Sequence, residues 1–431
     1  MTFLQSRTHG MFRSLRVRNY RLYASGQLIS LTGTWMQRVA QDWLVLELTD
    51  SGTALGIVTA LQFGPALLLG LWGGVVADRG DKRRILFATQ SALAAAALLL
   101  GVLDVAGVVA YWHVLVLALV LGLIAAVDTP VRQTFVVEMV GREDVPNAVG
   151  INSAIFNFGR ILGPAAAGVT IAAVGTGWAF LANAASSAAV LAALALMHPD
   201  ELHPSPSVRR AKGQLREGLR HVRGRADLVL PMVLIFIVGT FGLNFQITTA
   251  LMAKQVFHRS ASGYGLLSTA LAVGALCGAI VATTRRRRPS ALFLLTLTCV
   301  FAVLEIASGL MPSFGATAVL LVPTGLSMIS LTTAANSTVQ LGVDPRMRGR
   351  VMSLYLVCFM GGTPVGAPII GWLAGTAGPR WGLIGGGLVC LVAGLTLGGI
   401  GARRRGLTTA DLVDRLGGHR DAGADVPVRA A

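Results

Sequence analysis

The chain has 431 residues, a formal net charge of +16, 54% hydrophobic residues and only 13% charged residues. Ordinary soluble domains carry about 25% charged residues, so this composition excludes a soluble enzyme or binding domain and indicates an integral membrane protein. The basic residues recur in every second connection between apolar runs instead of gathering in one domain, so we expect no nucleic-acid partner.

About twelve apolar runs follow one another, each near the roughly 20 residues that cross a bilayer as a helix. The predicted domains are a basic N-terminal arm (1–20), a first bundle (21–197), a basic linker (198–226), a second bundle (227–402) and a polar tail (403–431). The expected helices are 22–46, 54–77, 85–105, 112–136, 148–174 and 178–197, then 228–252, 264–283, 290–310, 315–340, 351–376 and 381–401. A loop is expected at 138–147, and the linker is either a short amphipathic helix on the membrane surface or a solvated connection.

Positive charge alternates along the connections. The arm, the 79–84 turn, the linker and the segments 285–288, 346–350 and 403–405 are arginine-rich, whereas the other connections carry only Lys254, Arg259 and Arg380. Short loops rich in Lys and Arg stay in the cytoplasm, so both termini are predicted to be cytoplasmic.

The two halves are internal repeats. Gly33-Thr34 matches Gly239-Thr240 at an offset of 206, and Gly122, Gly159, Gly163, Gly168 and Trp178 match Gly325, Gly362, Gly366, Gly371 and Trp381 at an offset of 203. This predicts an all-α membrane protein of twelve transmembrane helices, arranged as two pseudo-symmetric six-helix bundles. The predicted helix-packing positions are Gly159, Gly163, Pro164, Gly362 and Gly366.

The repeat conserves glycines but not charges. The first-half residues Arg38, Asp42, Asp128, Arg132 and Arg160 correspond to the uncharged Asn244, Thr248, Leu331, Ala335 and Thr363. A charge at mid-membrane costs about 2.5–3.5 kcal/mol on insertion scales. The five charges therefore indicate either a function or a structural ion-pair network. Glu305, in the second half, is expected near the membrane interface.

Arg38 and Asp42 lie one helical turn apart and form a polar face with Trp35 and Gln41. Asp42 is the first candidate for a proton carrier, because a carboxylate desolvated between helices can titrate during transport. Arg38 would pair with it as a switch, and Asp128 is the next candidate. A position at the outer mouth would instead make Asp42 an ordinary acid.

Further candidates for a substrate cavity come from three helices. They are Asn152, Phe156, Arg160, Asn244, Thr248 and Asn336. Arg160 is expected to reach Asp128 or the substrate. Arg38 and Arg160 favour an anionic cargo and Asp42 and Asp128 a cationic one, so the sequence leaves the cargo's charge open.

The stretch from Gly70 to Arg84 changes from apolar to charged at Asp78. Its pattern G-x-x-x-D-R followed by a basic cluster resembles the signature loop of the major facilitator superfamily, with Asp81 where the usual motif has glycine. The resemblance implies that Asp78 binds the N-terminus of the helix beginning near Gly349, where free N–H groups favour an anion, as a cytoplasmic latch. Gly74, Arg79, Arg83 and Glu138 would complete this latch. A purely topogenic basic patch is the alternative, but it does not explain Asp78.

Several blocks point to one branch of that superfamily. They are Gly33-Thr-Trp-Met-Gln-Arg-Val-Ala, Ala77-Asp-Arg-Gly-Asp-Lys-Arg-Arg, Asp128-Thr-Pro-Val-Arg-Gln, Ala148-Val-Gly-Ile-Asn-Ser and Arg160-Ile-Leu-Gly-Pro-Ala-Ala-Ala-Gly. Over about residues 13–400 the chain resembles the bacterial enterobactin-exporter and macrolide-efflux type of facilitator, also called transmembrane secretion effectors.

The resemblance implies a proton-driven exporter of a small amphipathic molecule, such as a siderophore or a drug, in the bacterial cytoplasmic membrane. Its implied partners are the substrate, protons and the lipid bilayer. We expect a monomer. We also expect no cofactor beyond the proton gradient, no metal and no catalytic residues, because the sequence has no G-x-x-x-x-G-K-S/T stretch, no His/Asp/Glu cluster and no paired cysteine spacing. A non-transporting receptor or scaffold and a facilitator-type importer are the alternatives.

Overall fold

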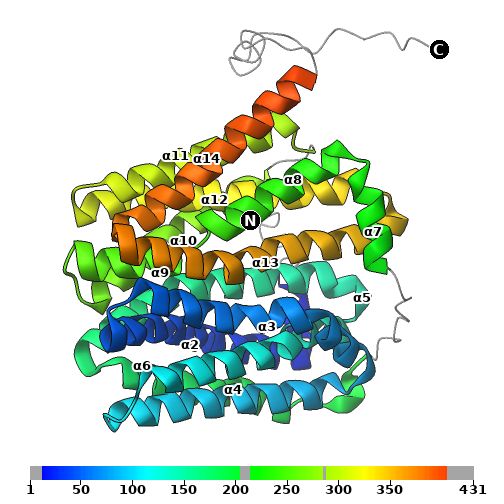
Figure 1. Cartoon of the computed structure of the whole chain (residues 1–431). Helices are drawn as coiled ribbons and strands as arrows, with labels where there is room; N and C mark the ends of the chain where they lie inside the picture. The colour runs from blue at the N-terminus through cyan, green and yellow to red at the C-terminus, as the bar shows by residue number, and fades with distance from the viewer. Residues whose placement is uncertain (1–11, 204–213, 285–287, 405–431) are drawn as a thin grey trace, which may run out of the picture.

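The computed structural model describes residues 12–203, 214–284 and 288–404, and all regular elements in these ranges are helical. Figure 1 shows two layers of roughly parallel helices, with α2–α6 in the lower part and α8–α14 in the upper part. The expected arm residues 1–11, linker residues 204–213, the arginines 285–287 and the tail residues 405–431 lie outside the described residues.

The first half comprises η1 (Arg13–Arg16), α2 (Arg18–Thr49), α3 (Gly52–Arg79), α4 (Lys82–Val105), α5 (Tyr111–Val174) and α6 (Thr176–Ala195). After η2 (Pro199–Glu201) and α7 (Gln214–Arg223), the second half comprises α8 (Ala226–Ile237), η3 (Val238–Gly242), α9 (Phe245–Leu251), η4 (Met252–Val256), α10 (Ala261–Thr283), α11 (Ala291–Leu310), α12 (Phe314–Gly342), α13 (Pro345–Ala377) and α14 (Pro379–Arg404). Most bounds fall within a few residues of those predicted from the apolar runs.

Ten stretches of the described chain are long and apolar enough to cross a membrane. They are α3, α4, α5, α6, the segment Ala226–Val256 and α10–α14. Helix α2 is not among them, although its 32 residues span about 48 Å at 1.5 Å per residue. Polar residues such as Arg38, Gln41 and Asp42 lower its hydropathy.

Helix α5 corrects the prediction of a loop at 138–147. Residues on both sides of this region are helical, and the helix is broken at Gly141, which has a non-helical φ of 71° and ψ of 169°. Only glycine adopts this left-handed region at little cost. The two expected helices 112–136 and 148–174 therefore correspond to the two arms of α5, two helices that meet at Gly141.

The expected single helix 228–252 is also corrected, because it is interrupted twice. Two π-helical segments, η3 and η4, flank the short α9, and Asn244 stands between η3 and α9. The equivalent helix of the first half, α2, is continuous. Short π-helical segments of this kind occur frequently at functional sites.

Equivalent glycines pack equivalent helices in the two halves. A Cβ atom on Gly163 of α5 would lie 2.3 Å from Cβ of Trp35 on α2, and one on Gly366 of α13 would lie 1.5 Å from the carbonyl oxygen of Thr240 in η3. Gly159 and Gly362 face the same partner helices one turn earlier. Small residues allow membrane helices this close approach.

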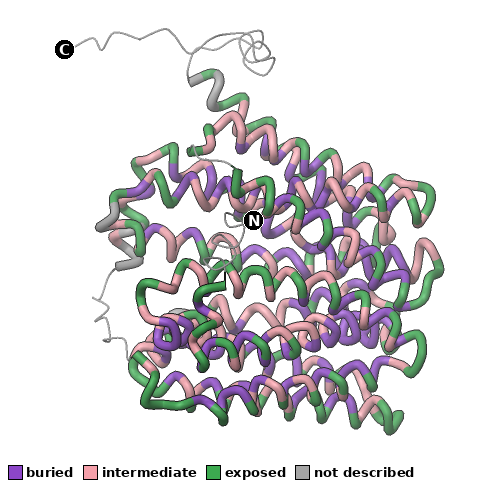
Figure 2. Tube along the Cα trace, turned by 180° about the vertical axis from the view of Figure 1, so that it is seen from behind, coloured by how far each residue is buried: buried purple, intermediate pink, exposed green. Residues whose placement is uncertain are grey.

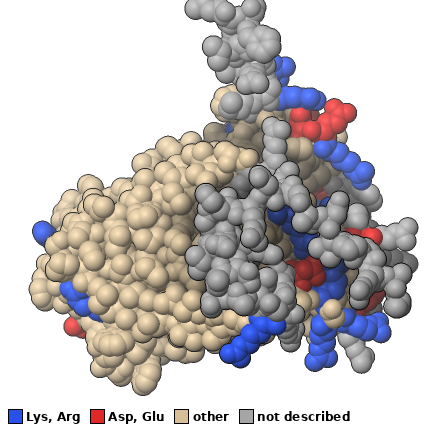
Figure 3. All heavy atoms as spheres, turned by 90° about the horizontal axis from the view of Figure 1, so that it is seen from above, with Lys and Arg blue, Asp and Glu red and all other residues tan. Residues whose placement is uncertain are grey.

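Charged side chains gather at one end of the molecule, and a broad uncharged surface separates them from a few charges at the other end (Figure 3). We call the end with the many charges the basic end; it carries Arg13, Lys82, Arg83, Arg225 and Arg288. The opposite end carries the turns at 50–51, 106–110 and 257–260.

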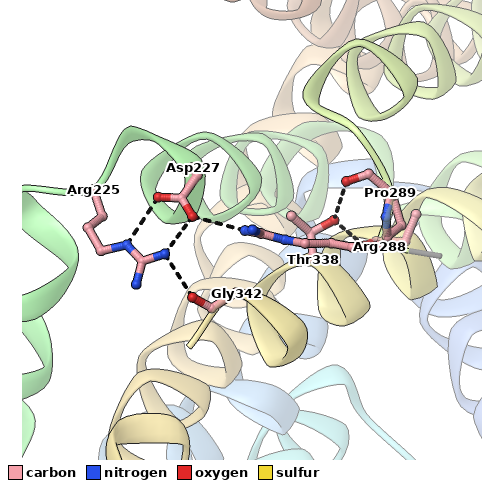
Figure 4. Close-up of polar contacts among 7 residues, drawn as sticks. Arg225, Asp227, Arg288, Pro289, Thr338 and Gly342 are labelled. Atoms are coloured by element: carbon pink, nitrogen blue, oxygen red, sulfur yellow. Dashed lines mark hydrogen bonds and ion pairs between the residues drawn. The ribbon is translucent and has the colours of Figure 1, made fainter. Parts of the chain in front are cut away.

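A polar cluster fastens the second half at the basic end (Figure 4). Asp227 accepts hydrogen bonds from Arg225 at 2.7 Å and from Arg288 at 2.9 Å, and Arg225 also donates to the carbonyl of Gly342 at 2.8 Å. These contacts join the start of α8 to the end of α12.

Helix α7 lies against α13. Glu217 pairs with Arg350 at 2.6 Å, Val222 is buried, and Leu219 is 48% exposed. The sequence left a surface helix and a solvated linker open, and the described part of this segment is a helix packed on the second bundle.

Candidate functional site

The two halves contact each other along the part nearer the opposite end. Helices α3 and α13 approach at Gly52, where a Cβ would lie 2.8 Å from the carbonyl oxygen of Gly371, and at Gly56, where it would lie 2.4 Å from that of Ala367. A further contact places Leu67 beside Gly361.

Helices α5 and α10 make the second such contact. A Cβ on Gly265 would lie 2.4 Å from the carbonyl oxygen of Pro164, and one on Gly168 would lie 2.9 Å from Cα of Ser262. Nearer the basic end, Gly70, Gly150 and Gly349 of α3, α5 and α13 have open space where a side chain would be. The described glycine contacts between the halves thus lie towards the opposite end, and these three glycines nearer the basic end make none. Figure 2 shows buried residues gathered along the facing sides of the helices.

Asp42 lies buried at the closely packed part of this interface, with 6% of its surface exposed. The Tyr264 hydroxyl of α10 donates a hydrogen bond to its Oδ2 at 2.7 Å. Trp43 stacks on the ring of Tyr264 with centroids 6.4 Å apart. Asp42 is therefore not an acid at the outer mouth but a buried acceptor that joins the two halves.

Arg38 does not pair with Asp42 within 4.0 Å in the described structure. Its guanidinium lies over the rings of Trp35 at 4.7 Å and Phe63 at 5.6 Å. Such cation–π contacts retain the charge while shielding it from lipid. The expected ion pair between Arg38 and Asp42 is thus not formed in this structure. Arg38 contacts the rings of Trp35 and Phe63 instead, and Asp42 accepts a hydrogen bond from Tyr264.

Asp128 is fully buried and fully engaged within the first half. It accepts hydrogen bonds from Thr89 at 2.8 Å and Gln90 at 2.8 Å, both on α4, and pairs with Arg132 one turn along α5. The expected contact with Arg160 is absent from the described structure. Asp128 thus fits the structural ion-pair network that the sequence left open, and it is a weaker proton-carrier candidate than Asp42.

Several polar groups around the interface have no partner among the described residues. Arg160 makes no hydrogen bond or ion pair there, Nε2 of Gln41 is buried without a partner, and Oδ1 of Asn244 is likewise unpaired. Phe156, 45% exposed, meets Trp35 edge to face at 5.6 Å. Unpaired buried polar groups are rare in native structures, so each calls for an explanation.

The remaining cavity candidates are engaged locally. Thr248 bonds to the carbonyl of Asn244 within its own segment, and Asn152 accepts a hydrogen bond from Tyr20 at 3.0 Å, which ties α5 to α2 near the basic end. Asn336 lies near Tyr355. These three fit packing roles at least as well as substrate contact.

Three residues of the signature loop make contacts within the first half. Asp81 caps α4 by accepting from the N–H of Arg84 at 3.1 Å, Arg83 donates to the carbonyls of Leu194 and Ala195, and Lys82 pairs with Glu138 at 2.6 Å. These contacts of Arg83 and Glu138 lie within the first half, and their expected part in a latch between the halves stays a prediction. Asp78 is half-buried in the last turn of α3, Gly74 is buried, and Arg79 is exposed; the latch itself stays a prediction.

A cluster that the sequence did not reveal closes the opposite end. Lys254 pairs with Asp50 at 3.0 Å and donates to the carbonyl of Leu46 at 2.5 Å, while Gln255 donates to the carbonyl of Asp50 at 3.0 Å. Its partners lie more than 200 positions apart in the chain, so their contact could not be predicted from local sequence. The one available signal was Lys254, a single lysine in a connection with few charges. We call Asp50, Lys254 and Gln255 the outer clamp.

We expect Asp50→Asn to weaken the outer clamp without unfolding the protein. An exposed ion pair contributes about 0.2–1 kcal/mol, so the ratio of open to closed molecules at this end should rise by up to about fivefold. Distances between spin labels at Leu48 and Ala377 would report the change. An unchanged distance distribution would show that the clamp contributes nothing.

The outer clamp should not respond to pH near neutrality. The hydrogen bond from Lys254 lowers the pKa of Asp50 from its usual value of 3.8. A lowered pKa means that the stabilisation is complete above the ordinary value and is lost only as the pH falls through the lowered one. At neutral pH the pair stays charged, and high salt is the condition that should weaken it.

The fold and this interface define a multi-pass membrane protein of the transporter type. A family model described as "Transmembrane secretion effector" matches residues 9–411. The chain belongs to this family of the major facilitator superfamily, as its signature loop and sequence blocks predicted, and is a multi-pass protein of the bacterial cytoplasmic membrane.

Three relatives have described roles. The chain is 27% identical to a staphyloferrin A transporter of Staphylococcus aureus over 60% of its own length and 65% of that protein. It is 27% identical to the multidrug efflux pump Tap of Mycolicibacterium fortuitum (80% and 87% covered) and 24% identical to the enterobactin exporter EntS of Citrobacter koseri (91% and 92% covered).

Solved structures support the fold. The crystal structure of the nucleoside transporter NupG superposes with a TM-score of 0.69, covering 88% of this chain and 98% of that chain at 13% identity. The family and the fold are those of transporters and not of enzymes.

Proposed function

We propose that this protein exports a small amphipathic anion in exchange for protons by alternating access. The observation that carries the proposal is the bond from Tyr264 to Asp42, because it places a buried carboxylate on the contact that joins the two halves at the closed end. A group that binds a proton there can change the strength of that contact. The exporters of siderophores and drugs among the relatives support the direction of transport.

The topology follows from charge. If α2 and the two arms of α5 each cross the bilayer, the ten candidate spans become twelve crossings, in bundles at 21–197 and 227–402. By the positive-inside rule the basic end faces the cytoplasm, with both termini. The described conformation is then closed to the outside, ready to accept cargo from within. We propose that it works as a monomer, with the proton gradient as its energy source.

The pairing of the charges favours an anionic cargo. Asp42 and Asp128 already have partners, whereas Arg160 has none among the described residues and Arg38 contacts only aromatic rings. A carboxylate or catecholate could supply the missing partner for Arg160, as charge-assisted hydrogen bonds do. Trp35 and Phe156 would contact the apolar part of such a molecule.

The test is efflux from energised cells that lack other pumps, using a catecholate siderophore, a macrolide and a cationic dye, each with and without a protonophore. We expect the siderophore to be exported and the protonophore to stop its export. Export of the dye alone would refute the anionic cargo but keep the exporter. Inward flux would favour an importer, and no flux of any probe would favour a receptor or scaffold.

A further inference from the structure

The second half contains a buried acid that the proposed mechanism does not use. Glu305 of α11 is 2% exposed, and its Oε2 has no hydrogen-bond partner among the described residues. The sequence placed this residue near the membrane interface, and the structure corrects that expectation. A carboxylate in this position would be costly, because burying a charge is tolerated only when the charge is paired or neutralised.

The carboxyl group lies between α14 and the first π-helical segment of the broken helix. A Cβ on Gly386 of α14 would lie 3.3 Å from Oε1 of Glu305 and 2.4 Å from the carbonyl oxygen of Phe241 in η3. A Cβ on Gly242 of η3 would lie 2.7 Å from Cε1 of Phe301, one turn before Glu305. It would lie 3.1 Å from Sγ of Cys390 on α14. The absence of side chains at Gly386 and Gly242 thus makes room for the carboxyl beside η3.

No cation neutralises Glu305 from the elements packed around it. Helix α12 and segment η3 contain no ionisable residue, and α11 offers only Cys299 besides Glu305. On α14, Cys390 faces the carboxyl, while Arg380 turns away to the carbonyls of Gly309 and Met311 at 2.8 and 2.7 Å. A neutral, protonated carboxyl fits this site, whereas an ionised one would require a partner or water.

We infer that Glu305 is a second proton-binding site, located in the second half and coupled to the π-helical break at Val238–Gly242. Glu305 holds a proton in the conformation described here. When the break rearranges and admits water, the O–H bond of the carboxyl breaks, the proton passes to that water and the carboxylate becomes hydrated. Intramembrane acids of this kind recur in proton relays. The inference rests on the proposed proton exchange for its role in transport, but proton binding by Glu305 can be tested alone.

The first experiment measures thermal unfolding of the purified full-length protein as a function of pH. A proton bound in the folded but not the unfolded state makes the unfolding equilibrium more favourable by tenfold per pH unit as the pH rises above the ordinary glutamate pKa of about 4.3. Glu305→Gln, which keeps the shape without the charge, should lower this dependence by the contribution of one proton, while the contribution of Asp42 remains. Glu143→Gln, a change at an acid of α5 whose side chain is 88% exposed, is the matched control and should keep the wild-type dependence. Equal pH profiles for wild type and Glu305→Gln would overturn the inference.

The second experiment separates this inference from the proposed function. In liposomes, Glu305→Gln should retain exchange of the siderophore at equal pH on both sides but lose accumulation driven by a pH gradient. Gradient-driven transport that is intact in both wild type and variant would overturn the coupling role while leaving the exporter. A wild type without gradient-driven transport would refute the proton exchange, and the unfolding profile would still decide whether Glu305 binds a proton.

A third measurement uses the unaltered protein, in case the variant does not fold. Dicyclohexylcarbodiimide reacts with protonated carboxyl groups in apolar surroundings. We expect peptide mass spectrometry to find the adduct on Glu305, with less labelling as the pH rises. Labelling that does not change with pH, or that spares Glu305, would count against the inference.

Discussion

Asp42→Asn is expected to abolish proton-driven accumulation of cargo while leaving a folded, membrane-inserted protein. Asparagine has nearly the same shape, and its carbonyl oxygen can still accept the hydrogen bond from Tyr264, but it cannot bind a proton. For each proton exchanged, a gradient of one pH unit can sustain about a tenfold ratio of cargo. In liposomes this ratio should fall to about one in the variant, whereas exchange at equal pH continues.

Tyr264→Phe is the matched control, because it removes the contact between the halves and keeps the carboxyl. Hydrogen bonds to charged groups contribute about 1.5–3 kcal/mol, so this variant should populate molecules that are open at the opposite end while still responding to the pH gradient. A tenfold cargo ratio sustained by Asp42→Asn would move the proton site elsewhere, with Glu305 the first alternative and Asp128 the next.

Gly366→Ala is expected to destabilise the second half by about 3 kcal/mol, the upper part of the usual range for overpacking. The added Cβ would lie 1.5 Å from the carbonyl oxygen of Thr240, a backbone atom that cannot rotate away. Helix α13 would have to separate from η3. Thermal unfolding in detergent, followed by the loss of monodisperse protein, measures the effect.

Gly64→Ala on α3 is the matched control for this substitution. It also replaces a glycine inside a helix, but no atom lies within 4 Å of the position that its Cβ would take. Because glycine in a helix costs roughly 0.5–1 kcal/mol relative to alanine, this variant should be as stable as the wild type or slightly more stable. Equal melting temperatures for the two variants would mean that the glycine contact does not determine the packing.

The helices were largely predictable from the sequence, because apolar runs, glycine offsets and alternating charge are each visible in a single chain. The break at Val238–Gly242 was not. No proline lies within it, and Pro231 lies inside α8 one to two turns earlier. Gly239, Gly242 and Asn244 are the local residues that could have suggested it. Likewise, Gly141 is the residue of α5 that departs from helical φ and ψ values, so the break between its two arms is much shorter than the expected loop.

The site was predictable only in part, because its contacts join distant segments. The polar face around Asp42 could be recognised from helical spacing, but its partner Tyr264 is 222 positions away and is one of several aromatic residues in apolar runs. The burial of Glu305 depends on the space left by Gly386 on another helix. The glycine run at 385–387 was the available signal, and its meaning requires knowing which helix faces it.

The two helices that begin the halves differ in stiffness. Helix α2 is one uninterrupted rod of 32 residues, while its counterpart runs through four short pieces from Ala226 to Val256. Mechanical strain applied to this molecule should therefore concentrate in the second half, with the first half acting as the rigid frame against which it bends. Of two related repeats, one thus supplies a rigid first helix and the other a first helix that can bend.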